Sequence, residues 1–248
     1  MDNFSIGTAR AEDVDEIWAI IRTSFRGSHS PYIATGQSGY RSYLEEMLHD
    51  ENESNRRIVV AKESGRVAAF ADVTLNTASP NFLSRIAVAP LYRGRGLATR
   101  LMKEIQREIG TTSQWELDVL HSNSSAHRMY RALGFRTTST KKWIGRLIPA
   151  NDALDPETNS VHSAADQAYQ RYGFTRVEIQ DRLASIAGTA VRCHDPGDFL
   201  DNGFLAKVRD GFPRVDRAFI ISDARDSRVP ILPDMFEIAR SDRMIGTF

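Results

Sequence analysis

The sequence predicts an α/β protein of the mixed α+β type, with a largely antiparallel sheet. Two observations predict it: strand-type and helix-type patterns alternate along the first 147 residues, and three consecutive strands are joined only by short turns. Helices confined to a few connections of an antiparallel sheet are typical of this class. The expected elements are strands at 4–8, 57–62, 66–75, 82–88, 115–120 and 135–147 and helices at 14–21, 40–48, 97–109 and 126–133.

The helices are predicted from apolar residues that recur three and four positions apart, which is the spacing of one helix face. The four stretches with this spacing are Val14–Ile21, Tyr40–Leu48, Leu97–Ile109 and Ala126–Leu133. The strands between 57 and 88 are predicted from their turn signals. Glu63-Ser64-Gly65 and the segment Asn76–Pro80 interrupt the apolar runs, as hairpin connections do.

The regular alternation of strand and helix patterns is interrupted near residue 148. Pro149 and Asp155-Pro156 indicate a linker, so we expect one domain at 1–147 and a small α/β domain or extension of unknown function at 148–248. The patterns that follow predict a helix at 157–172, a strand at 175–179, a weaker segment at 180–188, a strand at 189–193, a helix at 196–211, a strand at 217–222 and a helix at 230–240.

Composition and charge exclude several classes of protein. Hydrophobic residues make up 41% of the 248 residues, and 32 Lys and Arg balance 32 Asp and Glu. Without a basic excess we expect neither a nucleic-acid nor a membrane partner. No apolar run approaches the ~18 residues of a membrane span, and no signal peptide is expected. One cysteine excludes an intrachain disulfide, so a cytoplasmic location is predicted.

The segment Arg93-Gly94-Arg95-Gly96-Leu97-Ala98 is suited to binding an anion. It lies between an apolar strand and a helix, where the first N–H groups have no intrahelical partner and the helix dipole is positive. Glycines let the backbone approach a phosphate closely. A P-loop is excluded because Leu97-Ala98 stands where Lys and Ser or Thr are needed. A nicotinamide dinucleotide is disfavoured because Thr99 replaces the third glycine, although Asp118 lies near the place of its acidic residue.

Residues 93–98 resemble motif A of the GNAT superfamily of N-acetyltransferases, which runs Arg/Gln-x-x-Gly-x-Gly/Ala, and the preceding Ile86–Pro90 is the usual lead-in. The segment Asn123–Phe135 resembles motif B of the family, Asn-x-x-Ala-x-x-x-Tyr-x-x-x-Gly-Phe. The order of elements also matches the family fold. The resemblance covers residues 1–147 and none of the last hundred.

The resemblance implies acetyl-CoA as co-substrate and no metal. It places the coenzyme pyrophosphate on backbone N–H groups of residues 94–99 and the pantetheine arm between two splayed strands, 86–88 and 115–120. Asn123 is a contact of the pantetheine, or only a helix cap. The coenzyme-binding residues expected are Ile86, Ala87, Val88, Arg93, Gly94, Arg95, Gly96, Leu97, Ala98, Thr99 and Asn123.

The catalytic groups are less completely specified. The resemblance makes Tyr130 the general acid, although the residue also fits a buried helix stripe. Some family members carry a glutamate on the strand before motif A, but residues 81–84 contain no carboxylate. Asp72, Asp118 and His121 remain as candidate bases, together with a base acting through water.

Three further features remain open. His29, Tyr32 and Tyr40, in or beside the loop at 27–39, are candidates to line the acceptor site. The tail residues Ala165, Tyr169, Gly173 and Phe174 repeat the spacing of Ala126, Tyr130, Gly134 and Phe135. We interpret this echo as coincidence and expect no second acetyltransferase unit, because the tail has no glycine segment. Cys193-His194-Asp195 lacks the further ligands of a metal site.

The sequence therefore predicts an N-acetyltransferase that moves an acetyl group from acetyl-CoA to a primary amine by direct attack, with a tyrosine protonating the thiolate. The alternative is a non-catalytic acetyl-CoA-binding or degenerate domain with a partner-binding C-terminal region. A small molecule or a peptide is the expected acceptor, and a homodimer is left open.

Overall fold

The computed structural model describes residues 4–49, 55–77, 80–110, 113–149 and 163–247. Contacts divide the chain into two compact units. Unit 1 comprises Met1–Phe25, Arg41–Thr140 and Ser241–Phe248, and unit 2 comprises Arg26–Tyr40 and Lys141–Arg240. This division differs from the boundary predicted at 147/148, because the loop after the first helix belongs to unit 2 and the C-terminal segment belongs to unit 1. The predicted linker at 149–156 and the start of the helix predicted at 157 fall largely outside the described residues.

The strands and helices predicted for the first 147 residues are present, with small shifts at their ends. They are β1 (Phe4–Thr8), α1 (Val14–Ser24), α2 (Tyr40–His49), β2 (Arg56–Glu63), β3 (Arg66–Thr74), β4 (Asn81–Val88), α3 (Leu97–Ile109), β5 (Trp115–Leu120), α4 (Ser124–Ala132) and β6 (Arg136–Leu147). The last strand of the chain is β11 (Met235–Gly246). Both β6 and β11 pass from one unit into the other.

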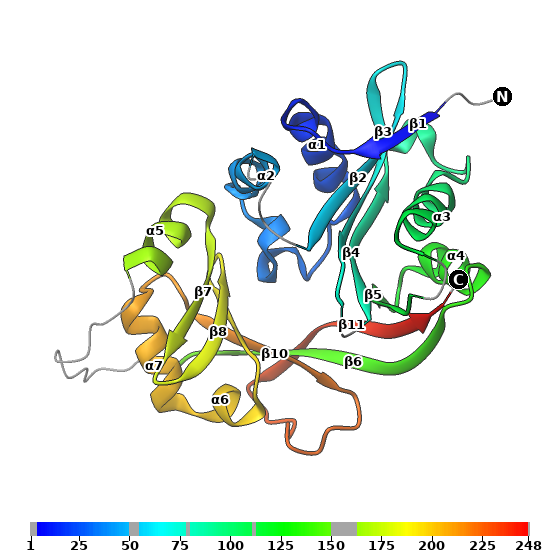
Figure 1. Ribbon diagram of the computed structural model, residues 1–248. Coiled ribbons are helices and arrows are strands. Elements are labelled where there is room, and N and C mark those ends of the chain that lie inside the picture. The colour runs from blue at the N-terminus through cyan, green and yellow to red at the C-terminus, as the bar shows by residue number, and fades with distance from the viewer. Residues whose placement is uncertain (1–3, 50–54, 78–79, 111–112, 150–162, 248) are drawn as a thin grey trace. The chain divides into compact units, whose positions relative to one another are not determined.

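The sheet of unit 1 has the strand order β1-β2-β3-β4-β5-β11-β6. Strands β1 to β4 are antiparallel neighbours, and β5 runs parallel to β4 after the crossover through α3. Helices α1 and α2 lie on one side of this sheet and α3 and α4 lie on the other (Figure 1). The core on the α3 and α4 side contains Leu101, Met102, Trp115 and Leu117.

A β-bulge interrupts β4 in the middle of the sheet. Asp72 of β3 pairs with Arg85, whereas the next residue, Val73, pairs with Leu83, so Ser84 is an extra residue in β4. A bulge bends the strand that carries it and increases its twist. The parallel pairing of β4 with β5 covers Asn81–Leu83 and stops at this point. The bulge therefore marks where β4 departs from β5.

Unit 2 repeats part of this topology. Its elements are α5 (Ser163–Tyr172), β7 (Phe174–Ile179), β8 (Arg182–Ala187), β9 (Ala190–Cys193), α6 (Pro196–Leu200), α7 (Asn202–Gly211) and β10 (Arg217–Asp223). The strand order is β7-β8-β9-β10-β6, with three antiparallel strands followed by a helical crossover to the parallel strand β10. This is the arrangement of β2, β3, β4, α3 and β5 in unit 1.

The loop at 27–39 packs within unit 2. Tyr32 is 8% exposed and its ring meets that of Phe219 edge-on at 5.3 Å, in a small cluster with Ile238. The ring of His29 lies edge-on to Trp143 at 6.1 Å. Tyr40 is also buried, 5.9 Å from the ring of Phe174. These three residues, predicted as candidates for an acceptor site, are packing residues of unit 2.

Two predictions about the tail are wrong. Of the helix predicted at 230–240, residues 235–240 form the first part of β11, which pairs antiparallel with β5 over Ser241–Gly246; residues 230–234 precede the strand. Sheet pairing overrides the helix-forming residues of this segment, since propensity is a weak preference. The helix predicted at 196–211 divides at Asp201, whose extended backbone and side chain cap a new helix through the N–H groups of Gly203 and Phe204.

Candidate functional site

The glycine turn lies between β4 and α3. Gly94 and Gly96 have φ angles of +77° and +72°, in the left-handed region that favours glycine. A Cβ at either position would meet no atom within 4 Å. The glycines are therefore required by the backbone conformation, and the space beside them is open.

The N-terminus of α3 is not capped by a side chain. Gly96 is the N-cap residue, and the first intrahelical bond is donated by the N–H of Arg100 to the carbonyl of Gly96. The N–H groups of Leu97, Ala98 and Thr99 precede this bond and have no partner further back in the helix. Together with the helix dipole, these N–H groups have the chemistry to bind an anion, and the anion site stays a prediction.

The two arginines of the turn hold it against neighbouring strands. Arg93 donates from Nε to the carbonyl of Val88 at 3.1 Å. Arg95 forms an ion pair with Glu63 at 2.9 Å, and its guanidinium lies 4.8 Å from the ring centre of Phe4. Both side chains brace the turn, so its capacity for an anion lies mainly in the backbone.

Beyond the bulge, one edge of β4 is no longer paired with β5. Ile86, Ala87 and Val88 pair with β3 on their other edge. The pairing of β4 with β5 ends at Leu83 and Leu117, while β5 continues to pair with β11 on its far side. The splayed strands predicted from the family resemblance are thus present. Unpaired backbone groups there can receive an extended ligand as an additional strand.

Helix α4 carries two of the predicted site residues, Asn123 at its N-cap and Tyr130 in its last turn. Asn123 is its N-cap, and Oδ1 accepts from the N–H of Ala126 at 3.1 Å. The cap uses the amide oxygen, so the amide nitrogen can still donate to a ligand. Tyr130 is 6% exposed, and its ring lies edge-on to Phe135 at 5.6 Å. Burial raises the pKa of Tyr130 above its ordinary value, so the phenol stays protonated and can act as a donor.

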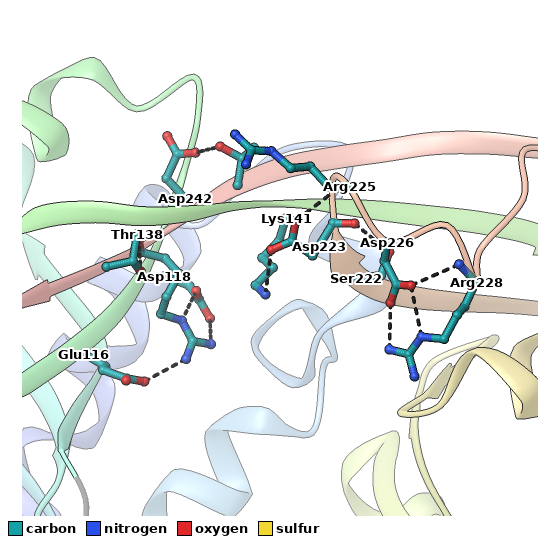
Figure 2. Close-up of polar contacts among 12 residues, drawn as sticks. Glu116, Asp118, Thr138, Lys141, Ser222, Asp223, Arg225, Asp226, Arg228 and Asp242 are labelled. Atoms are coloured by element: carbon teal, nitrogen blue, oxygen red, sulfur yellow. Dashed lines mark hydrogen bonds and ion pairs between the residues drawn. The ribbon is translucent and has the colours of Figure 1, made fainter.

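Two of the three candidate bases are tied to arginines. Asp72 is 1% exposed; burial opposes its ionisation, but hydrogen bonds and charge from Arg56 and then Arg85 outweigh burial and lower the pKa. Asp118 accepts two hydrogen bonds from Arg243, at 2.6 and 2.8 Å, and Glu116 accepts a third (Figure 2). Asp72 is therefore a poor proton acceptor, and both carboxylate oxygens of Asp118 are occupied by Arg243.

The third candidate, His121, has a different environment. It directly follows β5, and its side chain is 65% exposed. Its Nδ1 lies 3.0 Å from Oδ2 of Asp242 on β11. The sequence did not point to Asp242, because its partner is 121 residues away and the segment before it was predicted as helix. No local pattern marks such a pair.

Residues 14–135 match the model of the acetyltransferase (GNAT) family. The chain carries a GNAT acetyltransferase domain. The family resemblance inferred from motifs A and B is confirmed, since the match spans both segments. The GNAT domain lies in unit 1 apart from the loop 26–40.

Two mycobacterial relatives are similar to the GNAT domain. An uncharacterized protein of Mycobacterium leprae is 28% identical over 151 residues, which are 60% of this chain and 38% of that protein. The chain thus spans well under half of that relative. An uncharacterized N-acetyltransferase of Mycobacterium bovis is 25% identical over 140 residues, 52% of this chain and 86% of the relative.

The fold of the whole chain also has known counterparts. A tandem GNAT protein from the clavulanic acid biosynthesis pathway superposes with a TM-score of 0.66 at 12% identity, covering 99% of this chain and 98% of that one. At this identity the likeness concerns the fold alone. It extends through the C-terminal region, so unit 2 belongs to a known fold although its sequence pattern predicted only a small α/β domain.

Unit 2 contains the one cysteine of the sequence. Cys193 is buried, and burial raises the pKa of its thiol to about 12. Across the described ranges, no three His, Cys, Asp or Glu side chains are grouped so that they could hold a metal ion. In the same ranges, no helix is both long and apolar enough to cross a membrane.

Proposed function

We propose that the GNAT domain transfers an acetyl group from acetyl-CoA to a primary amine by direct attack. The proposal rests on two features that follow each other along the chain. Strand β4 stops pairing with β5, and the uncapped helix α3 then begins after the two left-handed glycines. One feature fits a pyrophosphate and the other fits the extended arm that ends in the thioester.

The coenzyme would bind along this path. The N–H groups of residues 94–99 receive the pyrophosphate. The pantetheine arm lies beside Ile86–Val88 as an extra strand, and the amide nitrogen of Asn123 donates to it. A backbone N–H of this part of β4 also donates to the acetyl carbonyl, which is the place for oxyanion stabilisation.

The chemistry needs one base and one acid. The neutral amine attacks the thioester carbon, and the carbon–sulfur bond of the tetrahedral intermediate breaks. Tyr130 donates its proton to the departing thiolate, in keeping with a phenol that burial holds protonated. His121 takes the proton that the amine loses, since Asp72 and Asp118 are engaged by arginines.

A substrate screen tests the proposal. Acetyl-CoA is offered with small amines, polyamines and peptides, and free thiol is measured as CoA is released. We expect transfer to at least one primary amine and none when the amine is replaced by its N-acetyl form. Acetyl-CoA binding without transfer to any amine would instead leave the non-catalytic alternative.

A further inference from the structure

We propose that Asp242, carried by the last strand of the chain, is a positioning residue that orients His121 to accept the proton of the amine. This inference rests on the proposed function and deepens it. The group concerned is the histidine–aspartate cluster, made of His121, His127, Thr140 and Asp242, all of which belong to unit 1.

The cluster is centred on a buried carboxylate. Asp242 is 5% exposed. Its Oδ1 accepts from the hydroxyl of Thr140 at 2.7 Å, a contact drawn at the Asp242 label in Figure 2. Its Oδ2 lies 3.0 Å from Nδ1 of His121 and 3.5 Å from Nε2 of His127. The carboxylate therefore meets one hydroxyl and two imidazoles, and these three groups come from three separate parts of the chain.

This carboxylate differs from the other two that were considered as bases. Asp72 and Asp118 each accept hydrogen bonds from arginine, whereas the charged partners of Asp242 within the described residues are the two histidines. Burying a carboxylate without a compensating cation is costly. Asp242 is instead surrounded by the hydroxyl of Thr140 and the two imidazoles, and its contact with Nδ1 can fix the orientation of the His121 ring.

The contact also fixes which nitrogen of His121 is available. An imidazole whose Nδ1–H donates to Oδ2 carries its lone pair on Nε2. The side chain is 65% exposed, so Nε2 can meet an incoming amine. His121 stands one residue past β5, at the end of the strand where β4 is no longer paired with it. The proposed thioester site lies at this opening.

His127 is the buried member of the pair. It lies on α4, its side chain is 10% exposed, and neither ring nitrogen has a hydrogen-bond partner among the described residues. One carboxylate can offset the charge of one imidazolium. Since His127 is enclosed and His121 is open to solvent, the proton from the amine resides on His121, and His127 fills the space behind the carboxylate.

The test is a pH–rate profile of acetyl transfer for the wild type, Asp242→Asn, His121→Gln and the double variant. We expect His121→Gln to lower kcat/KM by about 100-fold and to remove the acidic limb of the profile. Asp242→Asn should move that limb to lower pH, because the imidazolium loses its counter-charge, and lower kcat/KM at neutral pH by about tenfold. The double variant should be no worse than His121→Gln alone, because both substitutions remove one function.

Controls separate positioning from folding. Glu104→Gln makes the same acid-to-amide change on α3, where the residue pairs with Arg107, and should leave the profile unchanged. Thermal unfolding of each variant shows whether the fold is kept. An unmoved acidic limb in Asp242→Asn, or losses that add in the double variant, would overturn the proposal. If the wild type transfers acetyl to no amine, the proposed function falls with it, whereas full activity of His121→Gln overturns this inference alone.

Discussion

Each unit of the molecule contains three antiparallel strands followed by a helical crossover to a parallel fourth strand. In unit 1 the run is β2, β3, β4, α3 and β5, and in unit 2 it is β7, β8, β9, α6–α7 and β10. The fourth strand is where they differ. Strands β4 and β5 pair over three residues and then separate at the bulge, whereas β9 pairs with β10 along its whole length, Ala190–Cys193.

The helices that connect the third strand to the fourth also differ between the two units. In unit 1, α3 begins at Gly96 without a side-chain cap. In unit 2, the carboxylate of Asp195 accepts from the N–H of Gly197 at 2.7 Å, and that of Asp201 accepts from the N–H groups of Gly203 and Phe204. The backbone donors that would hold an anion are thus already occupied by carboxylates. We therefore expect the pyrophosphate to bind in unit 1, where an unpaired strand edge and an uncapped helix occur together.

The largest expected effect comes from cutting the chain at the boundary that the sequence predicted. Residues 1–148 lack β11, which lies between β5 and β6 in the sheet of unit 1. We expect this fragment to show no cooperative thermal unfolding, because a central strand and its hydrogen bonds are missing. Circular dichroism during heating, with the full chain as control, measures this. A cooperative transition in the fragment would show that unit 1 does not depend on the C-terminal strand.

The next effect concerns the turn that distinguishes the units. Gly96→Asp places a carboxylate at the N-terminus of α3, where it repels the pyrophosphate, and adds a Cβ at a left-handed backbone position. We expect acetyl-CoA affinity to fall by about 100-fold, or ~2.7 kcal/mol. Gly65→Asp is the matched control, because Gly65 also has a left-handed φ, +81°, with no atom within 4 Å of an added Cβ. Calorimetry should find wild-type affinity in the control, and equal losses in both would refute the assignment.

Each unit has a tyrosine at the same spacing before a glycine, and the two are expected to have different roles. Tyr130 and Tyr169 share the spacing to a following glycine, but the Tyr169 hydroxyl donates to the carbonyl of Gly188 at 2.7 Å. Within the described residues the Tyr130 hydroxyl has no such bond. We expect Tyr130→Phe to lower kcat by about 10- to 100-fold with little change in KM for acetyl-CoA. Tyr169→Phe should instead reduce the free energy of unfolding by about 1 kcal/mol and leave kcat unchanged. A loss of kcat in Tyr169→Phe, or wild-type kcat in Tyr130→Phe, would contradict these roles.

The smallest effect is expected at the caps of unit 2. Asp195→Ala removes an N-cap and should lower the free energy of unfolding by about 1 kcal/mol. Acetyl-CoA affinity should not change, because uncapping α6 does not open β9 from β10. Denaturant unfolding and calorimetry on the same preparation measure both. A new acetyl-CoA site in the variant would show that the caps alone had closed unit 2.

Sequence patterns of neighbouring residues predicted most of the helices, strands and turns. Helix stripes and turn residues predicted the elements between residues 4 and 147, and the glycine segment predicted a turn directly before α3. The repeated spacing in the tail is also local, since Gly134 and Gly173 each end a helix with a left-handed φ, +86° and +77°. However, α4 leads into β6 and α5 leads into the edge strand β7, so the repeated signal occupies different places in the fold.

Features that depend on distant pairing could not be predicted in this way. The segment 235–246 has helix-forming residues, and its place between β5 and β6 in the sheet makes it a strand. The loop at 27–39 carries no local pattern that predicts its packing on Phe219, which is distant from it in the sequence. Asp242 reaches His121 only because the chain returns to unit 1 after building unit 2. The proposed base therefore depends on the whole chain, not on the motifs alone.

The most direct test of the account is the number of acetyl-CoA molecules that bind per chain, with CoA and NAD as comparators. Calorimetric titration of the full chain should find one site for acetyl-CoA and CoA, no binding of NAD, and loss of that site in Gly96→Asp. Two sites per chain, or one site that survives Gly96→Asp unchanged, would contradict the claim that the uncapped helix beside the opened strand of unit 1 is what binds the coenzyme.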